Sequence, residues 1–432
     1  MSTPDHNHND ATNNGYLFSQ RGTFVTFGLL TVLMVFDFAD RMILAALLPA
    51  IKAEWHITDA TAGLLSSILT LGMVVFAFPA AIAIDRWSRV KSASVMGVVW
   101  SLASAAGALA QSVGQLLFTR GLVGIGEAGY APAAYTWISA AFPKRRRQLA
   151  LGLFSSAQPI GMAIGVAAGG YIATHYGWKH ALGIIALPGL LVALALYKGK
   201  DYKNLHKPQT STPEQPSTRD GVKVILKTPS LLLAYLSAGL GTLQWVPVVF
   251  FLPTWLNREH GVGVQSASLM TSGLMLLAIV SVPLGGWLMD RWNHRDDRAK
   301  VIWPILAGAT NTALLALAFT AVNDLTLRYT LIIIGFFIGA SGGTGALAMT
   351  QELVHPGIRA FSSTCSVVAI HLIGSVPGPF LAGWLSDRYG LTTALLTLIV
   401  VAGTGQVLAL AFSLRHYRTD LSRVSTFQLE AA

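Results

Sequence analysis

The stretches AIAIDRWSRVK at residues 81–91 and GWLMDRWNHR at residues 286–295 decide the fold expected for this 432-residue chain. Each follows a long apolar run, places Asp-Arg four residues after a small residue, and carries a further arginine a few residues later. Because the copies start 205 residues apart, they occupy the same place in each half of the chain. A basic loop that recurs between apolar helices in this way indicates a membrane protein built from two repeats.

Composition agrees with a protein that lies in a bilayer. Hydrophobic residues make up 53% of the chain and charged residues 12%, whereas soluble domains carry about 25% charge. The single cysteine, Cys365, excludes an intramolecular disulfide. The net charge of +10 does not indicate nucleic-acid binding, because Lys and Arg gather in short loops between apolar runs, where they set membrane topology.

Apolar runs predict an all-α membrane protein with twelve transmembrane helices in two pseudo-symmetric six-helix bundles. A helix needs about 20 apolar residues to cross a bilayer, and six such runs fall in residues 23–198 and six in 230–414. Residues 199–229 are rich in Lys, Pro, Thr and Gln and are predicted to form a flexible cytoplasmic linker. Residues 1–22 and 415–432 are predicted to be cytoplasmic tails, the first of them disordered.

The distribution of Lys and Arg predicts that both termini are cytoplasmic. With that orientation, the cytoplasmic side holds 23 of the 30 Lys and Arg residues and the outer side holds five. Positive residues accumulate in the cytoplasmic loops of membrane proteins, so the asymmetry supports this topology. The short loops favour the plasma membrane (inner membrane) of a bacterium, and the chain is predicted to act as a monomer.

The chain resembles the major facilitator superfamily along essentially its whole length. The resemblance rests on the two Asp-Arg loops, on RGLVGIGEAGYAP at residues 120–132, and on glycine-rich runs in the predicted fifth and eleventh spans. It implies two bundles that rock around a central cavity lined by spans 1 and 4. It also implies that a set of loop residues switches conformation instead of binding substrate: Asp85, Arg86, Arg89, Asp290, Arg291 and Arg295.

Two groups within that superfamily are similar to this sequence. FADRMILAALLPAI at residues 38–51 and TRGLVGIGEAGYAPAA at residues 119–134 resemble both the anion:cation symporters and the Spinster-like transporters. AFPKRRRQLALGLFSSAQPIG at residues 141–161 is more similar to the anion:cation symporters. Asp37-Phe38 departs from an Asn-Tyr pair common in both groups, which leaves the exact substrate open.

Five charged residues fall inside predicted spans, where charges are costly and generally functional. Span 1 holds Asp37, Asp40 and Arg41, and span 4 holds Arg120 and Glu127. Three carboxylates against two guanidinium groups favour a working site over a purely structural cluster, because a buried carboxylate without a partner is costly. Burial favours the neutral form of a carboxyl group, and a nearby arginine favours its charged form. A carboxylate that gains and loses an arginine during the cycle would therefore bind and release a proton.

These properties predict individual roles, which the matching positions of the family also carry. Asp40 and Glu127 are predicted to bind protons. Arg41 is predicted to grip a substrate carboxylate, because its planar fork matches that group. Arg120 is predicted to orient one of the two carboxylates or to touch substrate. Asp37 either lines the cavity or pairs the outer ends of helices.

Four further residues are candidates for contact with substrate. Tyr130 in span 4 is predicted to line the cavity. Gln244 and Trp245 in span 7, and His371 in span 11, are candidates for orienting substrate. A tryptophan or a lone histidine in a membrane helix is also commonly a packing residue, and that alternative stays open for Trp245 and His371.

The predicted function is secondary active transport of a small organic anion, a carboxylate or sugar acid, by proton symport. A Spinster-like, proton-coupled transporter or exporter of lysolipids or amphiphiles is the alternative, and a non-transporting membrane receptor is a third possibility. The sequence shows neither a P-loop lysine motif nor a nucleophile–base constellation, so no enzyme activity is expected. The predicted partners are substrate, protons and the lipid bilayer, with no metal, cofactor or nucleic acid.

Overall fold

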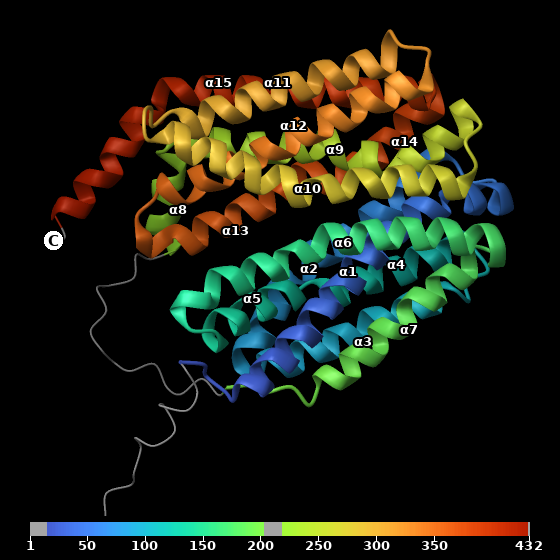
Figure 1. The fold of residues 1–432 in the computed structure, drawn as a ribbon, viewed down its shortest axis with the longest axis horizontal. Helices are drawn as coiled ribbons and strands as arrows, with labels where there is room; N and C mark the ends of the chain where they lie inside the picture. Colours follow the sequence, from blue (N-terminus) through green and yellow to red (C-terminus); the bar gives the residue numbers. More distant parts are fainter. Residues whose placement is uncertain (1–14, 203–217, 431–432) are drawn as a thin grey trace, which may run out of the picture. The chain divides into compact units, whose positions relative to one another are not determined.

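The computed structural model describes residues 15–202 and 218–430, and every regular element within these ranges is a helix (Figure 1). The prediction of an all-α membrane protein is therefore confirmed as far as the fold class. The first half of the chain contains α1 (Gln20–Trp55), α2 (Asp59–Arg86), α3 (Arg89–Gly107), α4 (Val113–Glu127), α5 (Tyr130–Ala141), α6 (Lys144–Tyr176) and α7 (Trp178–Leu196).

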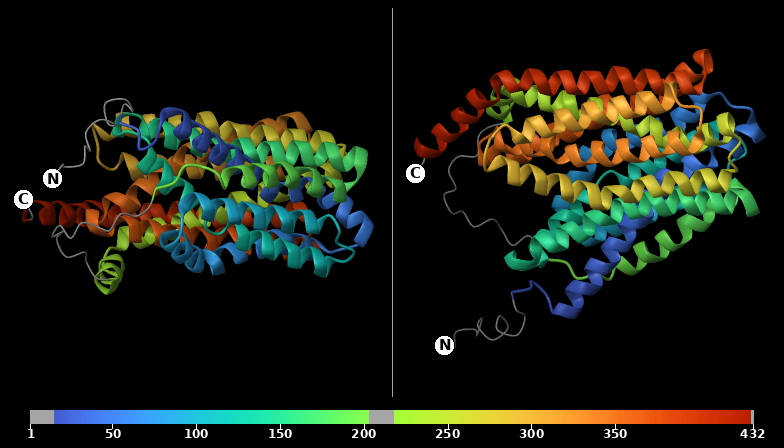
Figure 2. Two further views of the ribbon diagram at one scale, coloured as in Figure 1. Left: turned by 90° about the horizontal axis from the view of Figure 1, so that it is seen from below. Right: turned by 45° about the horizontal axis from the view of Figure 1, so that its top comes forward.

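The second half follows the same plan, with one additional short helix and an interruption in its eleventh predicted span. α15 lies beside both α9 and α11, and α11 also lies beside α12 (Figure 2). The helices are α8 (Thr218–Leu226), α9 (Pro229–His260), α10 (Val264–Asn293), α11 (Ala299–Thr320), α12 (Leu325–Glu352), η1 (Pro356–Ile358), α13 (Arg359–Ala369), the π-helix η2 (Ile370–Ser375), α14 (Pro377–Tyr389) and α15 (Leu391–Glu430).

Short polar residues and glycines set several helix boundaries. The side chains of Ser88, Ser112 and Asp324 accept a hydrogen bond from the backbone amide three residues later, which satisfies a donor left open at each helix start. Gly177 and Gly390 have φ of 88° and 81°, a backbone conformation that favours glycine. Gly177 lies between predicted spans 5 and 6, and Gly390 lies between predicted spans 11 and 12. A glycine therefore turns the chain at the same place in both halves.

Ten helical segments within the described residues are long and apolar enough to cross a membrane. The predicted third and fourth spans are not among them. α3 has only 19 residues and includes four serines, and the fourth span is divided into α4 and α5 around Ala128 and Gly129. Buried Arg120 and Glu127 further lower the apolar content of α4. The count of twelve spans therefore remains a prediction.

The chain forms two compact units. Unit 1 contains α1, the part of α2 from Ile68 onward, α3 to α7, and Val264–Ser272 at the start of α10. Unit 2 contains His56–Ser67, the remainder of α10, and the other helices of the second half. The starts of α2 and α10 thus fall outside the unit that holds the rest of each helix. The predicted bundle boundaries at 23–198 and 230–414 treat both helices as undivided.

The predicted linker and tails contain more helix than expected. α8 lies inside the segment 199–229 because Ile225 is buried in an apolar cluster with Leu231 and Tyr235. α1 begins at Gln20, within the predicted N-terminal tail, and α15 continues to Glu430, well past residue 414. The rest of the tail and linker predictions fall on residues 1–14, 203–217 and 431–432, outside the described residues.

Two glycines bring α6 unusually close to α1. A Cβ atom at Gly161 would lie 2.4 Å from the carbonyl oxygen of Val35, and one at Gly165 would lie 2.2 Å from that of Ala39. No larger residue fits without separating the helices, which is the role of small residues in membrane helix packing. This contact holds α1 at the turn that carries Asp37, and so fixes part of the site described next.

Candidate substrate and proton site

The charged residues predicted from spans 1 and 4 meet in unit 1, where they form two separate groups. The first group, here called the Arg41 triad, consists of Arg41, Asp37 and Glu127. Arg41 Nη2 lies 2.8 Å from Asp37 Oδ2, and Arg41 Nε lies 2.9 Å from Glu127 Oε2. The guanidinium carbon also lies 4.5 Å from the centre of the Phe38 ring, within the range of a cation–π contact.

The second group, here called the Asp40–Arg120 pair, is buried, and both oxygens of its carboxylate have partners. Arg120 Nη1 lies 3.2 Å from Asp40 Oδ2, and Arg120 Nη2 donates a hydrogen bond of 3.2 Å to Ser104 Oγ. Ser104 Oγ in turn donates to Asp40 Oδ1. Each oxygen of the Asp40 carboxylate therefore has a partner, and both side chains of the pair are essentially fully buried.

Helical geometry explains why neighbouring residues join different groups. Asp40 and Arg41 project about 100° apart around α1. Asp40 therefore contacts α3 and α4, whereas Arg41 contacts Glu127 at the end of α4. Asp37 lies one turn before Arg41 and therefore on its side of the helix. On α4, Arg120 and Glu127 are two turns apart on one face, and each meets a different residue of α1.

Burial and charge distinguish the two groups. The Arg41 side chain is 17% exposed, whereas Asp37 and Glu127 are fully buried. Among the five charged residues, Arg41 is thus the one open to a ligand. With all groups ionised, the Asp40–Arg120 pair is neutral, and the Arg41 triad carries one negative charge.

In unit 2, Gln244 of α9 belongs to a neutral polar network. Its Nε2 donates hydrogen bonds of 2.9 Å to Thr312 Oγ1 and 3.2 Å to the carbonyl oxygen of Ile399. Its Oε1 accepts a bond of 3.2 Å from Asn311 Nδ2. The side chain is buried and its amide is committed within the unit, so the geometry favours packing over substrate contact for Gln244.

The remaining substrate candidates are divided between the units. Tyr130 is completely buried, donates a hydrogen bond to the carbonyl oxygen of Leu30, and meets Trp100 edge-on with 5.2 Å between ring centres. These contacts favour a packing role for Tyr130. Trp245 and His371 are partly buried in unit 2, and His371 lies in the π-helix η2, a feature often found at functional positions.

The predicted gate residues lie at the ends of α2, α3 and α10. The side chain of Asp85 lies outside the described residues. Arg89 stacks over Tyr202, with 4.6 Å from the guanidinium carbon to the ring centre. Burial raises the pKa of the Tyr202 phenol, so it presents a neutral ring to the arginine. The other gate residues are exposed: Arg86, Asp290, Arg291 and Arg295.

One polar cluster in unit 2 was not predicted. Asp59, the first residue of α2, accepts bidentate bonds of 2.7 and 2.8 Å from Arg258 and one of 2.6 Å from Ser386. The carboxylate of Asp387 accepts from the backbone amides of Asp59 and Ala60, at 2.7 and 2.9 Å. An aspartate at a helix start is a sequence signal for capping, but its partners are hundreds of residues away.

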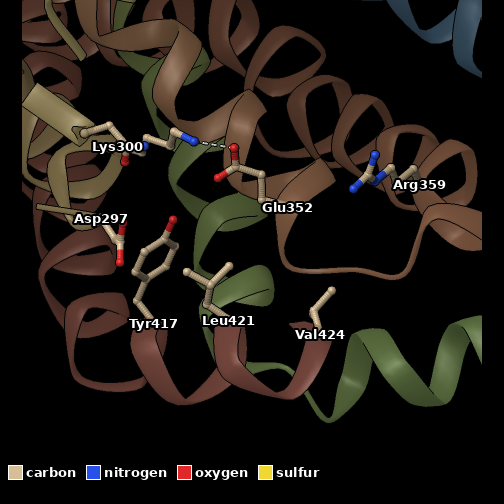
Figure 3. A pocket seen from close by; sticks show the side chains of 8 residues that line it. Asp297, Lys300, Glu352, Arg359, Tyr417, Leu421 and Val424 are labelled. Carbon is tan, nitrogen blue, oxygen red and sulfur yellow. Dashed lines mark hydrogen bonds and ion pairs between the residues drawn. The ribbon is translucent and has the colours of Figure 1, made fainter. Parts of the chain in front are cut away.

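A cavity of about 300 Å³ lies among the ends of helices in unit 2 (Figure 3). Lys300 and Glu352 form an ion pair across it, and Arg359 approaches from α13. Its charges are mixed, and it lies in a different unit from the Arg41 triad. The lining residues are Asn293, Asp297, Lys300, Glu352, Arg359, Tyr417, Leu421 and Val424.

The sequence matches the profile of the Major Facilitator Superfamily over residues 30–364. The chain belongs to this family, and the predicted resemblance is confirmed. It is accordingly a multi-pass membrane transporter and not an enzyme.

Similar proteins include transporters of different kinds. An MFS-type efflux pump of Mycolicibacterium smegmatis (strain ATCC 700084 / mc(2)155) is 28% identical over 389 residues, which cover 85% of each chain. The hexuronate transporter of Bacillus subtilis (strain 168) is 26% identical and covers 82% of this chain and 86% of its own. Protein spinster homolog 1 of Xenopus tropicalis is 27% identical, over 83% of this chain and 72% of its own.

Solved structures agree on the fold. A bacterial homologue of the human lysosomal transporter Spinster, in an inward-facing and unoccupied conformation, has a TM-score of 0.79 at 20% identity, covering 95% of this chain and 99% of that one. A D-xylose–proton symporter has a TM-score of 0.70 at 14% identity, covering 90% and 97%. At these identities the likeness extends to the fold alone.

Proposed function

We propose that this transporter is a proton-coupled symporter of a small organic anion, working by alternating access. The observation that carries the proposal is the Arg41 triad, in which a partly exposed guanidinium is held between two buried carboxylates. A guanidinium fork binds a carboxylate more specifically than a lysine does. The hexuronate transporter among the similar proteins supports a sugar acid or a related carboxylate as substrate.

The geometry suggests how protons and substrate are coupled. Asp37 and Glu127 occupy two nitrogens of Arg41, so a substrate carboxylate must compete with them. A proton on Glu127 weakens its hold on Arg41 and so helps an anion to compete for the guanidinium. Asp40 is the second proposed proton site, and Arg120 orients it directly and through Ser104.

A second candidate is transport of an amphiphile with an anionic headgroup. The similarity to a spinster homologue and to an efflux pump favours it, and Phe38 offers an apolar surface beside Arg41. In this case Arg41 would bind a phosphate instead of a carboxylate.

Topology completes the proposal. We propose twelve spans in two rocking bundles, from the apolar runs and the sequence repeat, and both termini in the cytoplasm, from the asymmetry of Lys and Arg. We also propose a monomer in a bacterial plasma membrane, which the short loops favour. The exposed arginines of the Asp-Arg loops are assigned to switching between conformations.

Proton flux into proteoliposomes tests the proposal. Purified protein is reconstituted, and external pH is followed while glucuronate, aromatic and aliphatic carboxylates, and lysolipids are added in turn. We expect alkalinisation of the medium with a carboxylate, and loss of accumulation but not of exchange in Asp40→Asn and Glu127→Gln. Asp324→Asn is the matched control, because Asp324 is an exposed helix cap and asparagine caps equally well.

The outcomes separate the two candidates. A response to lysolipid with none to any carboxylate would favour the amphiphile transporter. Unchanged pH dependence in both Asp40→Asn and Glu127→Gln would refute the assignment of proton binding to these residues.

A further inference from the structure

The Arg41 triad has one carboxylate more than it can neutralise. Arg41 supplies one positive charge, and Asp37 and Glu127 supply two negative charges. Both carboxylates are fully buried, and a buried ion without a compensating partner is strongly unfavourable. One negative charge at this place therefore requires a compensating positive charge.

Within the described part of the chain, the second nearby cation, Arg120, is already paired with Asp40. Among the described residues, the groups that act electrostatically on Asp37 or Glu127, besides these two themselves, are Asp40 and Arg41 on α1, Arg120 on α4 and Tyr130 on α5. Asp40 is matched by Arg120, and Tyr130 donates its hydroxyl to a backbone carbonyl. α6 approaches α1 here through glycines and carries no charge between Gly161 and Gly165. A proton from solvent is the simplest remaining compensation.

The geometry places the two carboxylates in equivalent positions to bind that proton. Each contacts a different nitrogen of the same guanidinium, at 2.8 and 2.9 Å. Whichever carboxylate is ionised is neutralised by Arg41, and the other is neutralised by the proton. Two carboxylates that share a site commonly bind one proton between them.

We propose that Asp37 and Glu127 share a single proton around Arg41 in the substrate-free transporter, which makes Asp37 a proton-binding residue. The inference builds on the proposed function and deepens it, because protonation of the second carboxylate is then what frees Arg41 for an anion.

The shared proton predicts that two different single substitutions have the same effect. Either Asp37→Asn or Glu127→Gln leaves one carboxylate and one guanidinium, a neutral pair that needs no proton. Each substitution alone should therefore abolish the same bound proton, although each removes a different carboxyl group. Asp37→Glu retains both carboxylates and should keep the proton.

Infrared difference spectroscopy of the purified, substrate-free protein tests this. The carbonyl stretch of protonated carboxylic acids is recorded at neutral pH in H₂O and D₂O, as wild type minus variant. We expect loss of one protonated carboxyl in both Asp37→Asn and Glu127→Gln, retention with a shifted band in Asp37→Glu, and no change in the control Asp324→Asn. Thermal unfolding and gel filtration of each variant establish that it is folded.

Other outcomes overturn the proposal. A band that survives in Asp37→Asn but disappears in Glu127→Gln would place the proton on Glu127 alone and leave Asp37 as an ionised structural partner. A band absent from wild type, or present in both variants, would exclude a shared proton. Because no substrate is added, these outcomes are independent of the liposome experiment: a shared proton without flux of any carboxylate would refute the proposed substrate class and keep the role of Asp37.

Discussion

The first helices of the two halves, α1 and α9, show how one repeat can hold charges where the other holds amides. Shifted by 205 residues, the end of α1 at Trp55 coincides with the end of α9 at His260. α1 carries Arg41 and Asp37 of the Arg41 triad. α9 carries Gln244, whose amide is satisfied by Asn311, Thr312 and a backbone carbonyl. The fold is repeated, but the chemistry is not.

The Gln244 amide and the Arg41 triad differ in whether their polar and charged atoms are fully compensated. Both polar ends of the Gln244 amide have hydrogen-bond partners, and none of its groups titrates in the physiological range, so it is expected to be insensitive to protons. The Arg41 triad is short of one positive charge and is open at Arg41. A group that is incompletely neutralised responds to protons and anions, whereas a neutral amide whose polar atoms all have partners only holds helices together.

Removing the cation of the triad should have the largest effect on transport. In Arg41→Ala the two carboxylates lose their only common partner, so we expect no measurable uptake. Arg41→Lys keeps the charge but loses the fork, and we expect at least a tenfold loss, about 1.4 kcal/mol. Uptake of labelled substrate into proteoliposomes measures both. Wild-type uptake by Arg41→Ala would mean that the triad is not the substrate site.

Breaking the Asp40–Arg120 pair should have the largest effect on stability. Arg120→Ala leaves Asp40 buried without a cation, and removing one partner of a buried ion pair costs about 3–5 kcal/mol. Thermal unfolding in detergent should show a marked decrease in midpoint. Asp40→Asn in the same background should recover part of the loss, because it removes the isolated charge. No recovery would contradict the pairing of these two residues.

Disrupting the amide network should affect stability alone. Gln244→Leu leaves Asn311 and Thr312 without their partner, and an unsatisfied buried polar group costs about 1–3 kcal/mol. We expect a lower unfolding midpoint and an unchanged pH dependence of transport. A shifted pH profile would contradict the contrast drawn between α1 and α9, and would return Gln244 to the substrate site.

The smallest effect is expected at the Asp59 cluster of unit 2. Arg258 is 36% exposed, although Asp59 is only 4% exposed, and ion pairs with a solvent-exposed partner contribute about 0–1 kcal/mol. Asp59→Asn, Arg258→Gln and the double variant form a cycle in which unfolding midpoints measure the coupling. A coupling well above that range would show that Ser386 and Asp387 make the cluster stronger than an ordinary exposed pair.

The sequence indicated which charged residues lie inside helices and meet in unit 1. Asp37, Asp40, Arg41, Arg120 and Glu127 stand out because charges inside apolar helices are rare and costly, and their roles stay predictions. Ser104 was missed, since serine is common in α3 and nothing in the sequence marks the one that meets Asp40. Gln244 is a candidate for orienting substrate in the sequence, because its position on a helix does not reveal whether its amide already has partners within the protein.

By itself, the sequence determined the all-helical membrane class, the repeat and the superfamily, because apolar runs and basic loops are local features that a bilayer imposes. Only the tertiary structure decided that Arg41 meets Asp37 and Glu127 while Arg120 meets Asp40 and Ser104. Pairing depends on which faces of α1, α3 and α4 meet, and on how closely the α6 glycines let α1 approach. These are distances between segments far apart in the chain, which no local pattern encodes.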